Sequence, residues 1–257
     1  MGGNIPACNE SLGGIMKKKH LAIVLSNLKG FEKPKLELEQ YKTPGDVAAE
    51  LLWLAYSMRD IEGKIIADLG AGTGVLSIGA SLMGAKKVYA VEKDEAALEI
   101  ARENTRTLGI DNIKFIHCNV SDFRTKVDAV IMNPPFGSQN PKADRPFLLK
   151  AFEISDVIYS IHLTKEEVRK FIEAFTRDNS FKITHRLTAT FEIPAQFFFH
   201  KKRLEQILVD IYRFERSELP PYGRGFVRVH HCFTLTGRFT RPLPPILTEG
   251  VLQTTER

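Results

Sequence analysis

The sequence has few cysteines and no long apolar run. Its 257 residues contain three cysteines, Cys8, Cys118 and Cys232, and no CxxC pair, which excludes a disulfide framework and a zinc ribbon. His230 and His231 precede Cys232 without a fourth ligand in sight, so we expect no metal site. No apolar run approaches the ~18 residues that cross a bilayer, and the first residues lack the features of a secretory signal. These absences favour a soluble protein of the reducing cytoplasm.

The charges of the chain almost balance. Lys and Arg number 36 and Asp and Glu number 31, which leaves a net charge of +5. This small excess is compatible with a polyanionic partner and does not require one. The length is sufficient for one large α/β domain with a buried core.

Three segments differ in composition. Residues 1–15 contain a single charged side chain, Glu10, and several glycines, so we expect a disordered tail. Residues 16–214 carry regular strand and helix patterns and form the expected main domain. Residues 215–257 are punctuated by prolines and contain a candidate hairpin at 226–236, so we expect a C-terminal extension of unknown structure.

Strand and helix patterns alternate through the main domain. We expect helices over 17–28, 44–56, 75–83, 94–108, 146–153 and 165–175, with Thr43 as the cap and Pro44 as the first residue of the second helix. We expect strands over 64–69, 87–92, 113–117, 128–132 and 157–162. This alternation predicts a parallel sheet with helices on both faces. Two further strand patterns, 181–193 and 204–214, have no helix between them and predict an antiparallel hairpin at the edge.

A glycine-rich turn follows the first expected strand. The run Asp68-Leu69-Gly70-Ala71-Gly72-Thr73-Gly74 has the spacing G-x-G-x-G, and Val75 stands where a dinucleotide fold requires its third glycine. Asp68 would repel a pyrophosphate at the helix N-terminus, whereas it can receive the ammonium group of an amino-acid ligand. The turn therefore favours S-adenosylmethionine over NAD.

Polar side chains at the ends of the next two strands extend this site. Glu92 ends the second strand and can accept hydrogen bonds from both hydroxyls of a ribose. Asn119 and Val120 follow the third strand and are placed to flank an adenine ring. Asp122 is a rival for the same contact, and the sequence leaves the choice between Asn119 and Asp122 open.

The fourth strand runs into Asn133-Pro134-Pro135-Phe136. The prolines stiffen the turn and favour extended backbone before each of them, so the Asn133 side-chain oxygen and the Pro134 carbonyl are expected to point outward. Two such acceptors can hold both hydrogens of a planar exocyclic amine, and Phe136 offers a face on which its ring can stack. Orientation beside an activated methyl group can then supply most of the rate without an obligatory general base.

The pair D-L-G-x-G-x-G and N-P-P-F is typical of class I amino-N-methyltransferases. Over residues 17–214 the chain more closely resembles the methyltransferase-like protein 5 family and its archaeal relatives, through four blocks in the same order: Gly30-Phe31-Glu32-Lys33-Pro34-Lys35, Glu39-Gln40-Tyr41-x-Thr43, the run from Val130 to Gly137, and Phe199-His200-Lys201-Lys202. The resemblance implies a class I Rossmann-like fold with a mostly parallel seven-stranded sheet. It also implies an adenine N6-methyltransferase acting on small-subunit ribosomal RNA.

The same resemblance implies roles for individual positions. Residues that would enclose the cofactor are Gln40, Thr43, Gly70, Thr73, Val75 and Glu92. The family's D-V pair beside the cofactor adenine reads Asn119-Val120 here, and an amide differs from a carboxylate as a partner for an adenine amine. The family also works with a small zinc-binding activator protein, which by analogy would cover an apolar edge of the sheet.

Basic and aromatic residues together indicate where RNA would bind. Phe199, His200, Lys201 and Lys202 combine positive charge with stacking faces, as single-stranded nucleic acid requires. The target adenine must leave its stack to reach Phe136, so a loop or junction is the expected substrate. His162, at the end of the fifth strand, fits a substrate contact and a structural histidine equally well.

Two other functions remain compatible with the sequence. The turn at 133–136 could serve any planar amine or amide, so guanine N2 or a protein glutamine amide are alternative acceptors. A non-catalytic RNA-binding assembly factor is the alternative outside enzymes. The methylated product distinguishes the acceptors, and cofactor binding distinguishes an enzyme from an assembly factor.

Overall fold

The computed structural model describes residues 16–137, 142–194 and 204–217. Residue contacts divide the chain into two compact units, Met1–Glu218 and Leu219–Arg257. The expected tail at 1–15 and the candidate hairpin at 226–236 lie outside the described residues, as do His230, His231 and Cys232. The three-segment organisation stays a prediction.

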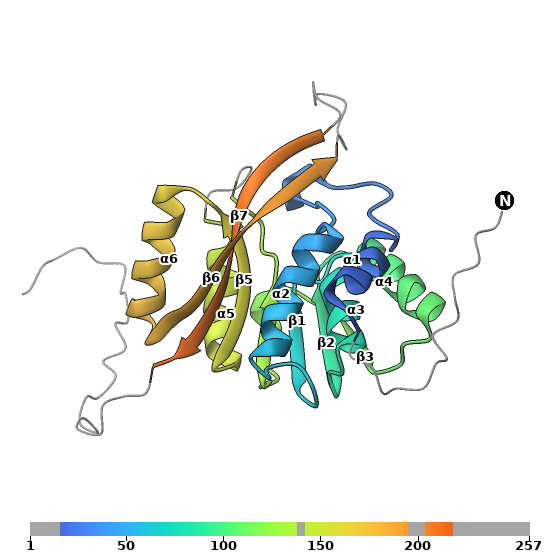
Figure 1. The fold of residues 1–257 in the computed structure, drawn as a ribbon, viewed down its shortest axis with the longest axis horizontal. Coiled ribbons are helices and arrows are strands. Elements are labelled where there is room, and N and C mark those ends of the chain that lie inside the picture. The colour runs from blue at the N-terminus through green and yellow to red at the C-terminus, as the bar shows by residue number, and fades with distance from the viewer. Residues whose placement is uncertain (1–15, 138–141, 195–203, 218–257) are drawn as a thin grey trace, which may run out of the picture. The chain divides into compact units, whose positions relative to one another are not determined.

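The first unit contains a seven-stranded sheet with the order β3-β2-β1-β4-β5-β7-β6 (Figure 1). The strands are β1 Ile65–Leu69, β2 Lys87–Glu92, β3 Ile113–His117, β4 Ala129–Met132, β5 Val157–Leu163, β6 Phe181–Pro194 and β7 Leu204–Arg216. The first five strands run parallel to one another, and β7 runs antiparallel to both β5 and β6. The predicted parallel sheet with an antiparallel edge hairpin is confirmed.

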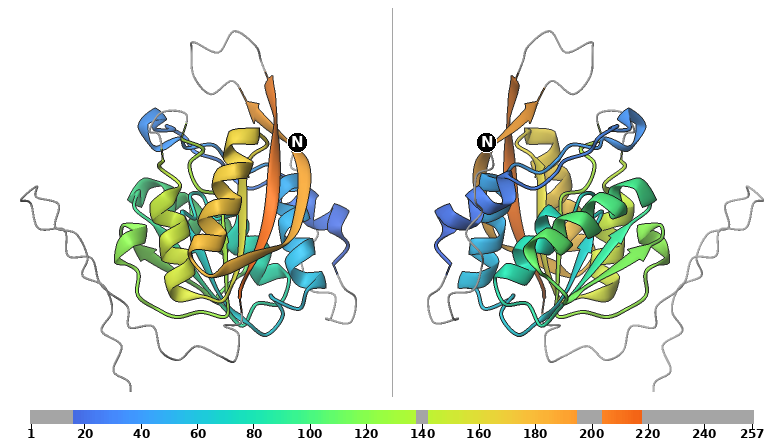
Figure 2. Two further views of the ribbon diagram at one scale, coloured as in Figure 1. Left: turned by 90° about the vertical axis from the view of Figure 1, so that its left-hand side faces the viewer. Right: turned by 90° about the vertical axis from the view of Figure 1, so that its right-hand side faces the viewer.

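Helices cover both faces of this sheet (Figure 2). They are α1 Lys18–Ser26, α2 Gly45–Ser57, α3 Val75–Leu82, α4 Glu95–Leu108, α5 Arg145–Ile154 and α6 Glu166–Asp178. Apolar side chains of α1, α2 and α3 form one core with the sheet, and those of α5 and α6 form a second core on the opposite face. No helix in the described part of the chain is both long enough and apolar enough to cross a membrane.

The strand order predicts a ligand crevice at the carboxyl ends of β1 and β4. The chain adds β2 and β3 on one side of β1 and then returns to add β4 and β5 on the other. Loops leaving the carboxyl ends of β1 and β4 therefore diverge to opposite faces, and ligands of open α/β sheets bind at such a switch point. The glycine-rich turn after β1 and the turn at 133–136 after β4 meet at this point.

The start of α2 differs from the prediction. Pro44 is the N-cap, Gly45 is the first helical residue, and no side chain caps the helix. The Thr43 hydroxyl instead accepts a hydrogen bond from Asn133 Nδ2 at 3.0 Å, a contact that a local capping rule cannot reveal. The predicted end of α4 at residue 108 is confirmed, and Gly109 after it has a left-handed φ of 66°, which glycine adopts without steric cost.

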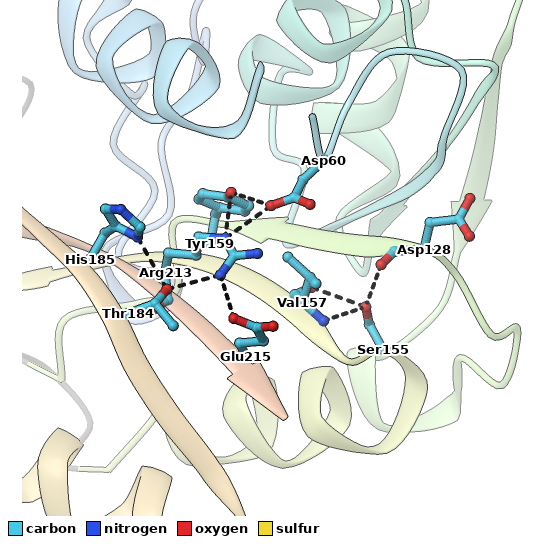
Figure 3. A network of polar contacts seen from close by, with 9 residues as sticks. All are labelled: Asp60, Asp128, Ser155, Val157, Tyr159, Thr184, His185, Arg213 and Glu215. Carbon is cyan, nitrogen blue, oxygen red and sulfur yellow. Dashed lines mark hydrogen bonds and ion pairs between the residues drawn. The ribbon is translucent and has the colours of Figure 1, made fainter. Parts of the chain in front are cut away.

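A buried polar network joins the end of α2 to β5, β6 and β7 (Figure 3). Tyr159 donates its hydroxyl to Asp60 Oδ2 at 2.6 Å and accepts from Arg213 Nε at 3.0 Å. Arg213 also donates from Nε to Asp60 Oδ2 and from Nη1 to Glu215. Burial, together with the Asp60 carboxylate, raises the pKa of Tyr159. The network satisfies Arg213, whose side chain is 7% exposed, so the charge lies in the core without an unpaired partner.

Tyr159→Phe is expected to lower the free energy of unfolding by about 1.5 kcal/mol, the low end for a hydrogen bond to a charged group. The low end applies because Arg213 retains its own 2.9 Å contact with Asp60. Urea denaturation measures the change. The matched control is Tyr56→Phe, because the Tyr56 hydroxyl makes no hydrogen bond within the described residues. Equal losses in the two variants would contradict the prediction.

Candidate cofactor and acceptor site

A pocket of about 320 Å³ lies at the carboxyl ends of β1, β2, β3 and β4. Twelve of the residues predicted for the site line it: Gln40, Thr43, Asp68, Gly70, Gly72, Thr73, Val75, Glu92, Asn119, Val120, Asn133 and Pro135. Gly74, Pro134 and Phe136 are predicted site residues that do not line the pocket, although each is adjacent in the chain to one that does. The structure thus brings the glycine turn, the ends of three further strands and the segment 37–43 together.

The turn after β1 brings backbone close to other groups. Gly70, Gly72 and Gly74 all have positive φ values, 78°, 53° and 87°, which other L-residues rarely adopt. A Cβ on Gly70 would lie 2.9 Å from Cε1 of Phe147. The glycines therefore allow the left-handed backbone of the turn, and Gly70 also leaves room for Phe147 at the pocket wall.

Gly70→Ala is expected to weaken cofactor binding because the new methyl group would displace Phe147 from the pocket wall. The variant should also lose about 1–2 kcal/mol of stability from its left-handed backbone. Gly109→Ala is the matched control, since Gly109 has a φ of +66° and nothing lies within 4 Å of its Cβ position. Calorimetry should show weaker binding for Gly70→Ala alone, while both variants lose stability. Equal cofactor affinity in the two variants would show that the space beside Phe147 is not needed.

Asp68 presents an unsatisfied carboxylate oxygen. The residue is 1% exposed, and Ser77 Oγ donates to Oδ2 at 2.6 Å. Oδ1 is buried and finds no hydrogen-bond donor among the described residues. Burial, with a smaller contribution from Glu92, raises the pKa of Asp68 to about 7. A cationic ligand group would stabilise the ionised form, so this position fits the ammonium group of an amino acid.

The carboxylate of Glu92 is held in place by backbone groups. Oε2 accepts from Gly72 N at 3.0 Å, and Oε1 accepts from Lys93 N at 2.8 Å and Asp94 N at 3.0 Å. These bonds link the end of β2 to the glycine turn. The lone pair that remains on Oε2 can accept a hydrogen bond from a ribose hydroxyl.

The next strand end contributes Asn119. This residue caps the short 3₁₀ helix Val120–Asp122, and its Oδ1 accepts from Ser121 N at 3.0 Å. Asn119 lines the pocket, whereas its rival Asp122 does not. Of the two candidates, Asn119 is therefore the one placed to meet a ligand in the pocket, and its contact with an adenine ring stays a prediction.

Asn133 begins the turn that follows β4. Its Nδ2 donates to Thr43 Oγ1, while its Oδ1 is buried without a hydrogen-bond partner among the described residues. Phe136 packs edge-on against Phe191 of β6, with ring centroids 5.6 Å apart and planes at 81°. Its stacking with a substrate base stays a prediction.

The segment before α2 is fixed to the pocket by contacts of Gln40, one of them with Asp94, a residue that the sequence did not single out. Gln40 Oε1 accepts from Lys35 N at 2.8 Å, and Gln40 Nε2 donates to Asp94 Oδ2 at 2.6 Å. Burial alone would raise the pKa of Asp94, but hydrogen bonds from Lys35 and Gln40 outweigh it and lower the pKa. Gln40 therefore uses both ends of its amide to hold the segment over the pocket. Asp94 also caps α4, and that capping position was its only signal in the sequence.

His162 is a buried, neutral histidine. It is 3% exposed, lies outside the pocket lining, and its Nε2 is 2.8 Å from Ser160 Oγ. Burial lowers its pKa to about 3, so it carries no charge near neutral pH. Of the two roles weighed for it, the structure favours the structural one. Phe199, His200, Lys201 and Lys202 lie outside the described residues.

Comparison with known proteins identifies the family to which the chain is similar. The model of the methyltransferase small domain matches residues 42–153. The chain is 38% identical over 206 residues to the rRNA N(6)-adenosine-methyltransferase METTL5 of Danio rerio, an alignment that covers 77% of this chain and 99% of the relative. It is 40% identical over 215 residues to an uncharacterized protein of Methanocaldococcus jannaschii, with 79% of this chain and 95% of the relative covered.

Solved structures confirm the expected fold. A crystal structure of a Pyrococcus horikoshii protein is 62% identical, covers 79% of this chain and 98% of that chain, and has a TM-score of 0.75. A crystal structure of a Thermoplasma acidophilum protein is 28% identical, covers 80% and 100% of the two chains, and has a TM-score of 0.63. The relatives are matched almost from end to end, so the similarity extends well beyond the glycine turn.

Proposed function

Because the chain belongs to the METTL5 family of rRNA N(6)-adenosine-methyltransferases, we propose that it transfers a methyl group from S-adenosylmethionine to N6 of an adenine in ribosomal RNA. The observation that carries this proposal is the buried, unpaired Oδ1 of Asn133 in the wall of the pocket. A buried acceptor without a partner costs free energy, and a substrate N–H would remove that cost.

The residues of the pocket fit the parts of S-adenosylmethionine. Asp68 Oδ1 would accept from the ammonium group, Glu92 Oε2 from a ribose hydroxyl, and Asn119 and Val120 would flank the adenine. Thr73 adds a buried hydroxyl that has no hydrogen-bond partner within the described part of the chain. Three of the groups without a partner, on Asp68, Thr73 and Asn133, line the pocket and are available to polar parts of the cofactor and the acceptor.

Asn133 favours an acceptor atom that carries hydrogens, such as an exocyclic amine. Its Oδ1 accepts hydrogen bonds only, so it favours a nitrogen that carries hydrogens, and we propose the Pro134 carbonyl as the second acceptor for an adenine amine. When bound, S-adenosylmethionine supplies an activated methyl group: the amine lone pair forms the new N–C bond, the electrons of the broken C–S bond return to sulfur, and the amine proton passes to water. Asn133 orients the amine so that its lone pair faces the methyl carbon.

Two finer features follow from the family resemblance. We propose that the target adenine lies in small-subunit ribosomal RNA and that a small zinc-binding activator protein binds this chain. β3 is a terminal strand of the described sheet, and Ile113, Phe115 and Ile116 on it are half-buried. A partner that adds a strand beside β3 would cover these side chains.

Methylation of purified ribosomal RNA tests the proposal. The protein, with and without its activator, is incubated with methyl-labelled S-adenosylmethionine and separated small-subunit and large-subunit RNA. We expect labelled N6-methyladenosine in the small-subunit RNA by nucleoside mass spectrometry. Labelled N2-methylguanosine in the RNA would identify guanine N2 as the acceptor instead of adenine N6. Label on a protein glutamine, when ribosomal proteins are supplied in place of RNA, would identify the amide. If calorimetry detected no cofactor binding, the result would favour a non-catalytic RNA-binding assembly factor over an enzyme.

The basic cluster predicted from the sequence gives a prediction about RNA affinity. Lys201→Glu with Lys202→Glu should weaken RNA binding, because two phosphate contacts are lost. The slope of log affinity against log salt should fall by about 1.4 to 1.8. The matched control is Lys64→Glu with Lys86→Glu, which makes the same charge change at exposed positions near the amino ends of β1 and β2. Equal losses in both double variants would place the RNA surface elsewhere.

A further inference from the structure

We propose that Thr43 is a positioning residue for methyl transfer: its hydroxyl holds the Asn133 amide in the orientation that turns Oδ1 toward the acceptor amine. This rests on the proposed function. It gives Thr43 a role different from the cofactor enclosure that the family resemblance implies. The contact joins residues 90 positions apart in the chain.

The geometry of the contact supports this role. Asn133 Nδ2 lies 3.0 Å from Thr43 Oγ1, and Thr43 is 8% exposed. The other amide atom, Oδ1, is buried without a partner among the described residues. One end of the amide is thus occupied by protein and the other is left for a ligand. An amide held at one end loses less conformational freedom when substrate binds at the other.

The orientation of this amide matters because its two ends have opposite hydrogen-bonding character. With Nδ2 on Thr43, the acceptor Oδ1 remains for the amine. If the amide turned by 180°, Nδ2 would face the N–H groups of the substrate, and two donors would meet. A side chain that only filled space at position 43 would offer the amide no hydrogen-bond partner, whereas the Thr43 hydroxyl accepts from Nδ2 in the structure.

A second contact fixes the same segment against the same turn. Glu39 Oε2 accepts from Gly137 N at 3.1 Å, so the segment from Glu39 to Thr43 touches the turn at both of its ends. Gln40 between them is tied to Asp94, and Pro44 after them is the N-cap of α2. Thr43 therefore lies on a stretch of backbone anchored on both sides, as a positioning residue requires.

The first test is a double-mutant cycle of Thr43→Val and Asn133→Ala on ribosomal RNA. Thr43→Val removes the hydroxyl at nearly constant volume and should lower kcat about tenfold, the effect of one hydrogen bond, with the cofactor Kd unchanged. Thr43→Ser should restore kcat. In the Asn133→Ala background, Thr43→Val should have no further effect, because its target is gone. Thr107→Val, at an exposed hydroxyl on α4, is the control.

The second test does not depend on activity. Side-chain amide resonances of 15N-labelled Asn133 are compared in the wild type, Thr43→Ser and Thr43→Val. We expect Nδ2 hydrogens that exchange slowly in the first two proteins and rapidly in Thr43→Val.

The two tests separate the possible failures. Additive losses in the cycle, a raised cofactor Kd in Thr43→Val, or unchanged amide exchange would overturn the role of Thr43. Wild-type protein that methylates no adenine would overturn the proposed function, and the amide exchange would still decide whether Thr43 holds Asn133.

Discussion

Asn133→Ala should lower the rate of methyl transfer by on the order of 10²–10³-fold, the loss seen when one preorganised hydrogen-bonding group is removed from a reacting centre. The reason is that Oδ1 of Asn133 is the buried acceptor left unpaired in the pocket wall. The other end of the amide, Nδ2, donates a hydrogen bond to Thr43 Oγ1. The variant keeps the backbone of the turn, which Pro134 and Pro135 stiffen.

Single-turnover kinetics and calorimetry measure this prediction separately. Since Asn133 is proposed to contact the acceptor and not the donor, the cofactor Kd should stay unchanged while kcat and kcat/KM fall together. Asn179→Ala is the control: Asn179 Nδ2 donates to Phe175 O at 2.7 Å at the end of α6, away from the pocket. A wild-type kcat in Asn133→Ala would show that the turn at 133–136 does not take part in methyl transfer.

Local patterns predicted most elements of the fold because they act over short distances. The periods of apolar residues marked β2 and β3 at the residues where the structure has them, Lys87–Glu92 and Ile113–His117. The predicted end of α4 at residue 108 also agrees with the structure, where Gly109 follows in a left-handed conformation. The glycine turn and the turn at Asn133 each lie within seven consecutive residues, so both could be recognised without knowledge of the fold.

Contacts between distant residues could not be predicted in the same way. Thr43 is a residue type that commonly caps helices, but in the structure its hydroxyl accepts a hydrogen bond from Asn133. Gln40 is bonded to Asp94, 54 residues away. The two-strand pattern predicted that β6 and β7 pair, whereas the placement of β7 between β5 and β6 depends on which strand packs better against β5. Local chemistry thus located the pocket, and long-range packing decided how its side chains are oriented.

Asp68→Asn should have opposite effects on stability and on cofactor binding. Burial raises the pKa of Asp68 from 3.8 to about 7, so between these values the folded state keeps a proton that the unfolded state releases. The wild-type free energy of unfolding therefore falls as pH rises from about 4 to about 7. Asn carries no charge, so the variant should exceed the wild type at pH 8 by at most about 4 kcal/mol, and the difference should shrink toward pH 4.

The same substitution should abolish most of the affinity for S-adenosylmethionine. An ammonium group is attracted by the ionised carboxylate, so wild-type affinity should rise with pH up to about the pKa of Asp68 and then level off. The variant should bind weakly at every pH, since an amide cannot replace the charge. Asp111→Asn, at an exposed position, is the control for both measurements.

Denaturation and calorimetry at pH 5 and pH 8 separate two roles for Asp68. A variant that is less stable than the wild type at pH 8 would show that the carboxylate supports the fold and is not kept at a cost for its ligand. Unchanged cofactor affinity would show that the unpaired Oδ1 is not the ammonium site. The combination of higher stability with lost binding is expected only if burial of this acid serves recognition of a cation, which is why the pocket tolerates an unpaired oxygen in its wall.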